Sequence, residues 1–356
     1  MTRKTPPPPP KKSTAATRAA TRAAARRRKV KSPEWVVHVL ECVDDKGKLT
    51  KVRVKRWTGP RHPLVPEIDP HYVFRTELAR ELAWAIWPHD DGAPTTMLLT
   101  GDKGAGKTSL VVQMAAHCNI GVQRINLNVG TTTRHLKGRV GAQDGSTKFI
   151  PGVATMAMEQ GLWLLLDEMS GATPPVALAL FPILEPEGAV MLEDAQPPRY
   201  VERHQDFRAF ATDNTIGADQ EESRFNYSGT NPEVNEALLD RIGSTMHVPY
   251  MSRELEFEMI RARIPSMDDD VLEGIIRIAG NIRESQQIGT SFSTRNTIEW
   301  SRRYAAGKID ASGKVTDREY TEVLDIAYPA FLNKMRSRME RDAVVEVIRR
   351  IFKLGA

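Results

Sequence analysis

The sequence lacks the long apolar runs that a membrane protein needs. No stretch approaches the roughly 18 uninterrupted apolar residues of a membrane-spanning helix, and no apolar core follows the charged N-terminus to indicate a secretory signal. Cysteine is scarce too, since only Cys42 and Cys118 occur and they show no paired spacing. We therefore expect a reduced, cytoplasmic compartment without membrane contact. His38 and His117 lie near the cysteines without completing a metal-ligand spacing, so these four residues predict no metal site.

Acidic residues are absent from the first 33 residues, which hold 11 Lys or Arg. The rest of the chain has 39 basic against 45 acidic residues, a net charge of −6, so the positive charge belongs to this arm. The five-proline run and the Ala, Thr and Arg after it predict disorder. Arg18, Arg22 and Arg26 would share one face of a helix. Three interpretations of the arm stay open: a solvated tail, a contact for nucleic acid or an acidic partner, and a transit peptide. The proline run disfavours the transit peptide.

Between the arm and the main domain the sequence predicts a small β-hairpin. Two β-rich runs, EWVVHVLECV and LTKVRVKRW, flank the turn Asp44-Asp45-Lys46-Gly47. A proline-rich linker follows. We expect the chain to divide into the arm at 1–33, the hairpin and linker at 34–64, an α/β nucleotide-binding domain at 65–250 and a helical lid at 251–356.

Strands and helices then alternate as far as residue 250. The expected strands cover 96–100, 122–129, 162–166, 207–212 and 245–249, with a helix over 108–118. This alternation predicts an α/β fold with a parallel sheet between two helical layers. Beyond Tyr250 the strands are expected to stop. The remaining segments, 252–264, 268–286, 294–305 and 317–352, all have helical patterns and form the predicted all-α lid.

The motif GDKGAGKT follows the first of these strands and opens the helix after it. It fits the P-loop pattern G-x-x-x-x-G-K-[ST] in the strand–loop–helix context that supports the assignment. Backbone N–H groups of such a loop, with the positive end of the helix dipole, bind phosphates. The predicted ATP contacts are Gly101, Asp102, Lys103, Gly104, Ala105, Gly106, Lys107, Thr108 and Ser109. Lys107 is expected to neutralise the β- and γ-phosphates, while the hydroxyl of Thr108 is a ligand for Mg²⁺.

Two further strands end in polar residues. An acidic pair, Asp167 and Glu168, closes LWLLLDEM, where a carboxylate beside a core strand needs a cation. Asp167 is expected in the Mg²⁺ shell, and Glu168 is expected to polarise the attacking water. Asn214, at the end of FRAFATDNT, is the candidate for orienting that water (the sensor-1 role), with Asp213 as its competitor.

Two arginines complete the candidate site. Arg241 ends the segment NPEVNEALLDRIG, whose Pro232 and Glu233 suit a first helical turn. In ring ATPases an arginine there reaches the neighbouring subunit's γ-phosphate as an arginine finger. Arg295, in SFSTRNTIEW of the lid, is expected to reach over the nucleotide in the sensor-2 role.

Together these residues resemble the MoxR-type AAA+ ATPases, which include the magnesium and cobalt chelatase motor subunits. VPEIDPHYVF, FRAFATDNTIG, YSGTNPEVNEALLDR, STRNTIEW and AFLNKMRSRMERDAV are most similar to the cobaltochelatase subunit CobS, over roughly residues 65–356. The resemblance implies a hexameric ring with ATP and Mg²⁺ between protomers and Arg241 acting in trans. It also implies a partner with a von Willebrand factor A (VWA) domain, and a hairpin insert at about 188–204. Members occur in bacteria and phages.

We therefore expect an ATP-hydrolysing ring that remodels or activates a protein partner. One alternative is a true cobaltochelatase motor, which would depend on a large chelatase subunit and a tetrapyrrole. Another is a DNA-associated motor that uses the basic arm. A nucleotide-gated binding module without turnover is a third, against which the presence of Glu168, Asn214 and Arg241 counts.

Overall fold

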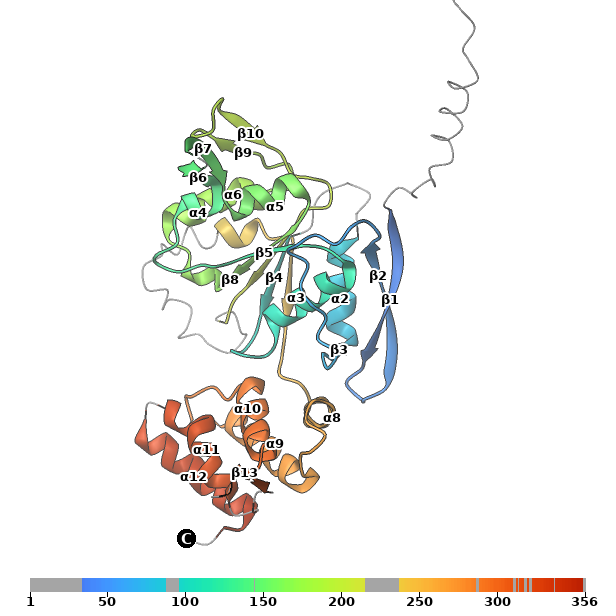
Figure 1. Cartoon of the computed structure of the whole chain (residues 1–356), viewed down its shortest axis with the longest axis vertical. Coiled ribbons are helices and arrows are strands. Elements are labelled where there is room, and N and C mark those ends of the chain that lie inside the picture. The colour runs from blue at the N-terminus through green and yellow to red at the C-terminus, as the bar shows by residue number, and fades with distance from the viewer. Residues whose placement is uncertain are drawn as a thin grey trace, which may run out of the picture.

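The computed structural model describes residues 34–87, 96–143, 145–214, 237–285, 288–309, 312, 314–316, 319, 322–335 and 337–354 (Figure 1). The basic arm at 1–33 lies outside the described residues, as do Pro232 and Glu233.

The N-terminal strands form a small sheet at the side of the α/β body (Figure 1). Strands β1 (Trp35–Val43) and β2 (Leu49–Trp57) pair antiparallel, and Oδ1 of Asp44 accepts hydrogen bonds from the backbone N–H of Lys46 and Lys48 in the turn. The short strand β3 (Phe74–Arg75) lies parallel to the end of β1. The predicted hairpin is therefore confirmed.

The central sheet has five parallel strands in the order β12-β4-β11-β8-β5. Their bounds are Thr96–Thr100 for β4, Val122–Asn126 for β5, Trp163–Asp167 for β8, Arg208–Thr212 for β11 and Ser244–His247 for β12. Strands β4, β8 and β11 are buried along their whole length, as expected when helices cover both faces of a parallel sheet.

Successive strand residues point to opposite faces, so the sheet separates two apolar cores. Helices α2 (Thr76–Ile86) and α3 (Lys107–Cys118) pack on one face, against residues such as Leu99 and Leu165. On the other face, α5 (Val153–Gln160) and α6 (Pro174–Leu184) pack against residues such as Leu98 and Leu166. The predicted three-layer α/β/α fold is confirmed.

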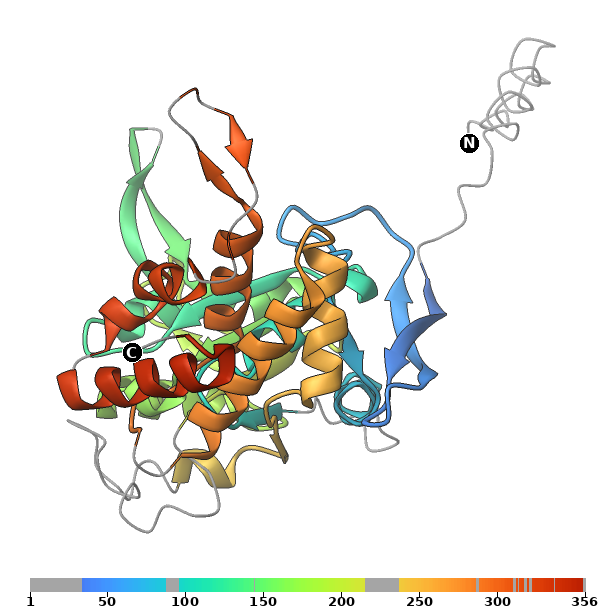
Figure 2. The same cartoon turned by 90° about the horizontal axis from the view of Figure 1, so that it is seen from below.

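Two antiparallel hairpins project from this domain. One follows the short helix α4 (Thr133–Lys137) and consists of β6 (Gly138–Gln143) and β7 (Ser146–Pro151). The other consists of β9 (Val190–Leu192) and β10 (Arg199–Val201), within the segment expected as an insert at 188–204. Both lie at the end of the domain away from the lid, and Figure 2 shows β6 and β7 extending outwards.

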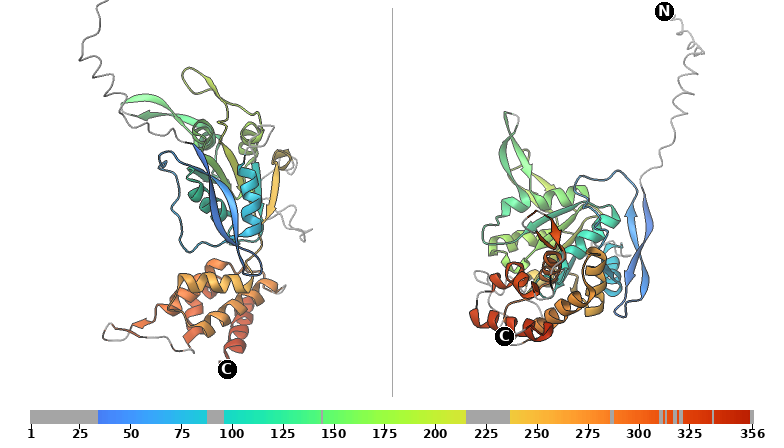
Figure 3. Two further views of the ribbon diagram at one scale, coloured as in Figure 1. Left: turned by 90° about the vertical axis from the view of Figure 1, so that its right-hand side faces the viewer. Right: turned by 60° about the horizontal axis from the view of Figure 1, so that its bottom comes forward.

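The C-terminal lid is a helical module at one end of the α/β body (Figures 1 and 3). Its helices are α8 (Arg253–Arg263), α9 (Asp269–Glu284), α10 (Thr294–Ala305), α11 (Val323–Ala330) and α12 (Arg338–Phe352), with a 3₁₀ turn, η4, at Leu332–Lys334. They bury a core of their own, with Trp300 and Phe331 in ring contact. The described helices include none with the length and apolar character that a membrane crossing requires.

Three details of the predicted elements are wrong. The lid does contain strands, β13 (Lys308–Ile309) and β14 (Val315–Thr316), which begin after Gly307 adopts a left-handed φ of 71°. The single helix predicted over 317–352 is divided into α11 and α12, because Phe331 leaves the helical conformation with a φ of −153° and the turn η4 follows. The strand predicted over 122–129 ends at Asn126, where the chain turns away from the sheet.

Candidate nucleotide-binding site

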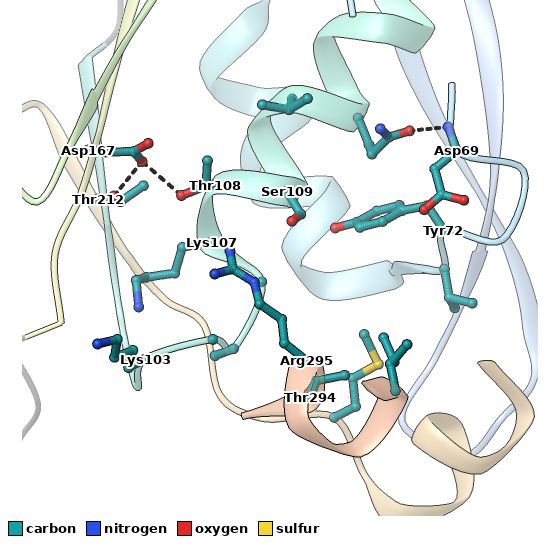
Figure 4. A pocket seen from close by; sticks show the side chains of 18 of the residues that line it. Asp69, Tyr72, Lys103, Lys107, Thr108, Ser109, Asp167, Thr212, Thr294 and Arg295 are labelled. Atoms are coloured by element: carbon teal, nitrogen blue, oxygen red, sulfur yellow. Dashed lines mark hydrogen bonds between the residues drawn. The ribbon is translucent and has the colours of Figure 1, made fainter. Parts of the chain in front are cut away.

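A cavity of about 560 Å³ lies between the carboxyl ends of the sheet strands and the lid. Its walls come from the P-loop, the ends of β5, β8 and β11, the segment before β3 and two lid helices (Figure 4). The carboxyl edge of a parallel sheet is where such folds bind ligands, because loops and helix N-termini converge there.

The P-loop needs glycine at three positions. Gly101, Gly104 and Gly106 have φ of 130°, 80° and 100°, a region that other residues adopt only with strain. Gly106 caps the N-terminus of α3, so the backbone N–H groups of its first turn open towards the cavity. This is the geometry that proteins use to bind phosphate groups.

Lys107 is buried behind the P-loop, with 6% of its surface exposed. Its Nζ donates hydrogen bonds to the carbonyls of Gly101 (2.7 Å) and Asp102 (2.8 Å) and to Oδ1 of Asn214 (2.7 Å). Burial lowers the pKa of Lys107, while the nearby carboxylates of Asp102, Asp213 and Asp167 oppose this shift. The ammonium group is thus already held at the phosphate side of the cavity.

Asp167 ties three strands together at the end of β8. Its Oδ1 accepts hydrogen bonds from Oγ1 of Thr108 (2.8 Å) and of Thr212 (2.9 Å), and Oδ2 forms an ion pair with Nε of Arg124 (Figure 4 draws the two threonine bonds). The carboxylate is nearly inaccessible, with 4% of the side chain exposed. A hydroxyl and a carboxylate side by side are the hard oxygen donors that suit Mg²⁺, so the residues present fit this ion.

The next residue, Glu168, faces the open cavity in a strained backbone conformation. Its φ is 55°, in the left-handed region that a residue with a side chain enters at a cost. Nδ2 of Asn126, on β5, donates a hydrogen bond of 3.2 Å to Oε2 of Glu168. Strain of this kind persists where the surroundings fix it and is common at functional sites.

The structure separates the two candidates for the sensor-1 position. Asn214 lines the cavity and binds Lys107, whereas Oδ2 of Asp213 accepts a hydrogen bond from the backbone N–H of Ser170 (2.6 Å). Oδ1 of Asp213 accepts from the N–H of Asn214 (2.7 Å) and so fixes the backbone of its neighbour. Asn214 is the residue placed to meet a ligand.

The far end of the cavity is apolar and lies between the linker and the lid. Tyr72, Met259 and Ile298 line it, which suits a flat base. Arg263 of α8 forms an ion pair with Asp69 at its edge and so joins the lid to the linker. Arg295 projects from the start of α10 towards the P-loop (Figure 4).

The lid and Tyr250, the residue directly before it, also contact the P-loop. The Tyr250 hydroxyl donates a hydrogen bond of 2.8 Å to the carbonyl of Lys103, and the ring of Tyr250 stacks on the Arg283 guanidinium at 4.3 Å. Burial raises the pKa of Tyr250 to about 12, so its hydroxyl stays a donor at neutral pH. A Cβ atom on Gly104 would lie 2.3 Å from Cβ of Ser293, so the loop and the lid are packed against each other.

Arg241 does not line this cavity in its own protomer. Its Nε forms an ion pair with Oε1 of Glu185 (2.9 Å), its Nη1 donates to the carbonyl of Ala237 (2.6 Å), and its guanidinium lies 4.0 Å from the ring centre of Phe181. The other predicted residues, from the P-loop to Asn214 and Arg295, therefore meet in one place, while Arg241 lies elsewhere on the protomer.

Sequence reasoning missed several residues of the site, including two from β5 and two from the linker. Arg124 and Asn126 belong to β5, and Asp69 and Tyr72 to the linker before β3. The polar side chains within the strand predicted over 122–129 were the available signal, but the pairing of this strand with the one that carries Asp167 was not predicted. The linker residues had no local signal, since the distant lid completes their part of the cavity.

The chain matches the AAA domain family (dynein-related subfamily) over residues 96–228. It is 27% identical over 300 residues to the aerobic cobaltochelatase subunit CobS of a Sinorhizobium species, covering 81% of this chain and 83% of that protein. It is 28% identical to the gas vesicle ATPase GvpN of Haloferax mediterranei, covering 66% and 68% of the two chains. Protein NorQ of Paracoccus denitrificans is 26% identical, covering 66% and 77%.

The parallel sheet, the P-loop and the helical lid define the chain as an AAA+ ATPase, an enzyme that hydrolyses ATP. Within that class it is an ATPase of the MoxR and CobS kind. AAA+ ATPases typically form oligomeric rings and generally bind ATP with Mg²⁺.

Proposed function

We propose that this chain forms a hexameric ring which couples ATP hydrolysis to the remodelling or activation of a protein partner. In each protomer, Lys107 neutralises the β- and γ-phosphates, and Thr108 and Asp167 hold Mg²⁺. When bound, that ion would screen the charge of the phosphates. Glu168 polarises the attacking water, Asn214 orients it, and Arg295 contacts the nucleotide from the lid.

The observation that supports this most is the hydrogen-bonded set at the carboxyl edge of the sheet. Thr108 reaches Asp167, and Lys107 reaches Asn214, so the P-loop contacts the ends of β8 and β11 directly. Glu168 follows Asp167 and lines the same cavity. Positioned donors of this kind are what phosphoryl transfer requires, because the protein contributes mainly orientation and charge stabilisation.

The contacts of Lys107 suggest how the site responds to nucleotide. Its Nζ is bound to the carbonyls of Gly101 and Asp102 and to Asn214. Charge-assisted bonds to phosphate oxygens are stronger than those to neutral carbonyls, so the ammonium group would exchange acceptors on binding. That exchange would free Asn214 for the attacking water.

Turnover and binding can be tested apart. Glu168→Gln keeps the shape of the side chain but cannot take up a proton, so it should bind ATP normally and lose turnover by orders of magnitude. Lys107→Ala should abolish binding, as measured with a fluorescent ATP analogue. Wild-type turnover by Glu168→Gln would overturn the assignment of the base.

We propose that the partner carries a VWA domain, as the resemblance to CobS suggests. Capture of such a protein by the ATP-trapped Glu168→Gln ring, but not by Lys107→Ala, is the expected result. A requirement for a large chelatase subunit and a tetrapyrrole would instead identify a cobaltochelatase motor. Binding of a partner with no measurable ATP turnover by the wild-type chain would indicate a nucleotide-gated module.

We propose further that Arg241 acts on the nucleotide of the neighbouring protomer. Its distance from the cavity of its own protomer supports this, and an arginine finger contributes about 10³–10⁵ in rate where one has been measured. Arg241→Ala alone should therefore be nearly inactive. Mixing it with Lys107→Ala protomers should restore activity, because each Arg241→Ala subunit can use its neighbour's intact arginine. No rescue in a ring that exchanges subunits would exclude action in trans.

The basic arm supports a second candidate function, attachment to nucleic acid. Its 11 positive charges stand on a chain whose remainder has a net charge of −6, so a polyanion would be attracted to the arm alone. A DNA-stimulated ATPase rate would favour a DNA-associated motor.

A further inference from the structure

The guanidinium of Arg241 is fixed on two edges and one face, although it lies near the protein surface. Nε is bound to Glu185 and Nη1 to the carbonyl of Ala237, and the ring of Phe181 lies against the plane of the group. The side chain is 28% exposed. Among the described residues, Nη2 of Arg241 has no hydrogen-bond partner.

Two of these three contacts come from the same helix. Phe181 lies in the last turn of α6, and Glu185 is the C-cap residue directly after that helix. The helix is firmly seated, since Val176, Leu180 and Ile183 are buried in the core against the sheet. The position of the Arg241 guanidinium is therefore set by a rigid element of its own protomer.

Helix α6 begins a few residues beyond Glu168. The chain runs from β8 through the 3₁₀ turn η1 (Met169–Gly171) and then enters α6 at Pro174. Glu168 and the residues that hold Arg241 therefore belong to one continuous segment of the chain, 168–185.

We propose that Glu185 and Phe181 are positioning residues that orient Arg241 for the γ-phosphate of the neighbouring protomer. The inference rests on the proposed action of Arg241 in trans. A long arginine side chain loses much rotamer freedom when it is fixed, and a side chain that is already ordered avoids that loss in the transition state. Displacing a charged group by about 1 Å can lower the rate about 100-fold.

The test is the steady-state ATPase activity of Glu185→Gln and Phe181→Leu. The first variant removes the charge that orients Nε, and the second removes the flat face while keeping an apolar side chain. Each should lower kcat roughly 10- to 100-fold and leave KM for ATP within about 2-fold, because nucleotide is bound by other residues. Glu187→Gln is the matched control: this exposed glutamate lies two residues away, and its kcat should stay within about 2-fold of wild type.

Mixed rings distinguish positioning from a general structural role. A Glu185→Gln protomer mixed with Lys107→Ala protomers should regain activity, because its own P-loop is intact and the neighbour offers a correctly held Arg241. A defect within the mutated protomer would not be rescued in this way. The thermal unfolding midpoint of Glu185→Gln, measured without nucleotide, should match that of wild type, since Glu185 is 47% exposed.

The outcomes separate the inference from the function on which it rests. Wild-type kcat in Glu185→Gln beside an inactive Arg241→Ala would overturn the inference and leave the arginine finger intact. An increase in kcat would also overturn it, because Glu185 would then restrain the arginine. Full activity of Arg241→Ala would overturn the trans function itself.

Discussion

Replacing Glu256 by leucine should destabilise the lid strongly. Glu256 and Arg283 form a two-pronged ion pair, with Nη1–Oε2 at 2.6 Å and Nη2–Oε1 at 2.9 Å, and their side chains are only 1% and 9% exposed. Removing the carboxylate leaves a buried guanidinium without its counter-charge. Loss of one partner from a buried pair costs about 3–5 kcal/mol of unfolding free energy. Arg283→Met should cost a similar amount, because it strands the carboxylate instead.

The double variant Glu256→Leu/Arg283→Met should lose far less unfolding free energy than the two single variants lose together. No buried charge remains in it, and replacing a buried pair by apolar side chains is often neutral. Nε of Arg283 also donates to the carbonyl of Phe292 (2.8 Å), and leaving that acceptor unpaired costs about 1–3 kcal/mol. We therefore expect the double variant to lie about 1–3 kcal/mol below wild type.

Urea unfolding followed by circular dichroism measures these differences. Glu284→Gln is the control, since the ion pair between Glu284 and Arg253 is 72% and 47% exposed and should contribute less than about 1 kcal/mol. A loss below about 1 kcal/mol in Glu256→Leu, or strict additivity in the double variant, would refute the reasoning.

Burial, and then the charge of Arg56, lowers the pKa of His38, and burial is also the main cause of the lowered pKa of His117. The unfolded chain then binds protons more tightly than the folded one, so the unfolding free energy should fall as the pH drops below about 6.5. In the variant His38→Gln/His117→Gln, the difference in unfolding free energy between pH 7.5 and pH 5.5 should be smaller than in wild type. Deletion of residues 1–33 should leave basal ATPase activity unchanged and remove any salt-sensitive DNA affinity, whose log–log slope is about −0.9 per phosphate neutralised; equal affinities with and without these residues would return them to the role of a solvated tail. Arg124→Gln should lower several-fold the Mg²⁺ concentration needed for half-maximal binding of a fluorescent ATP analogue, because the guanidinium competes for Asp167; an unchanged Mg²⁺ titration would contradict this.

The sequence predicted most reliably what is encoded locally. The P-loop directly follows the strand TMLLT, and Asp167 with Glu168 ends the apolar run LWLLL, so both element and chemistry could be inferred from a few neighbouring positions. The three-layer fold could be predicted from the alternation of strands and helices along the chain. The hairpin within 188–204 was expected only through the resemblance to the CobS family.

Features that depend on distant contacts escaped prediction. Asn126 belongs to the site because it donates a hydrogen bond to Glu168, and the two residues meet only because β5 and β8 are neighbours. The contacts of Arg241 with Phe181 and Glu185 could not be predicted either, because the sequence does not show that α6 lies beside Arg241. In the lid, the helical pattern over 317–352 hid the break at Phe331, and the strands β13 and β14 are too short to produce a pattern of their own.

The fourth position of the P-loop has a consequence for how this motif varies. The general pattern permits any residue where Gly104 stands, yet here a methyl group would meet Ser293 of the lid at 2.3 Å. The residue allowed at this point is therefore restricted not only by its φ of 80° but also by a different domain, about 190 positions further along the chain. A P-loop transplanted from a relative with a bulkier residue there would open the lid even though every phosphate contact was kept. In this protein the P-loop and the lid are in contact at Gly104 and Ser293. A larger side chain at either position is therefore expected to require a matching change at the other.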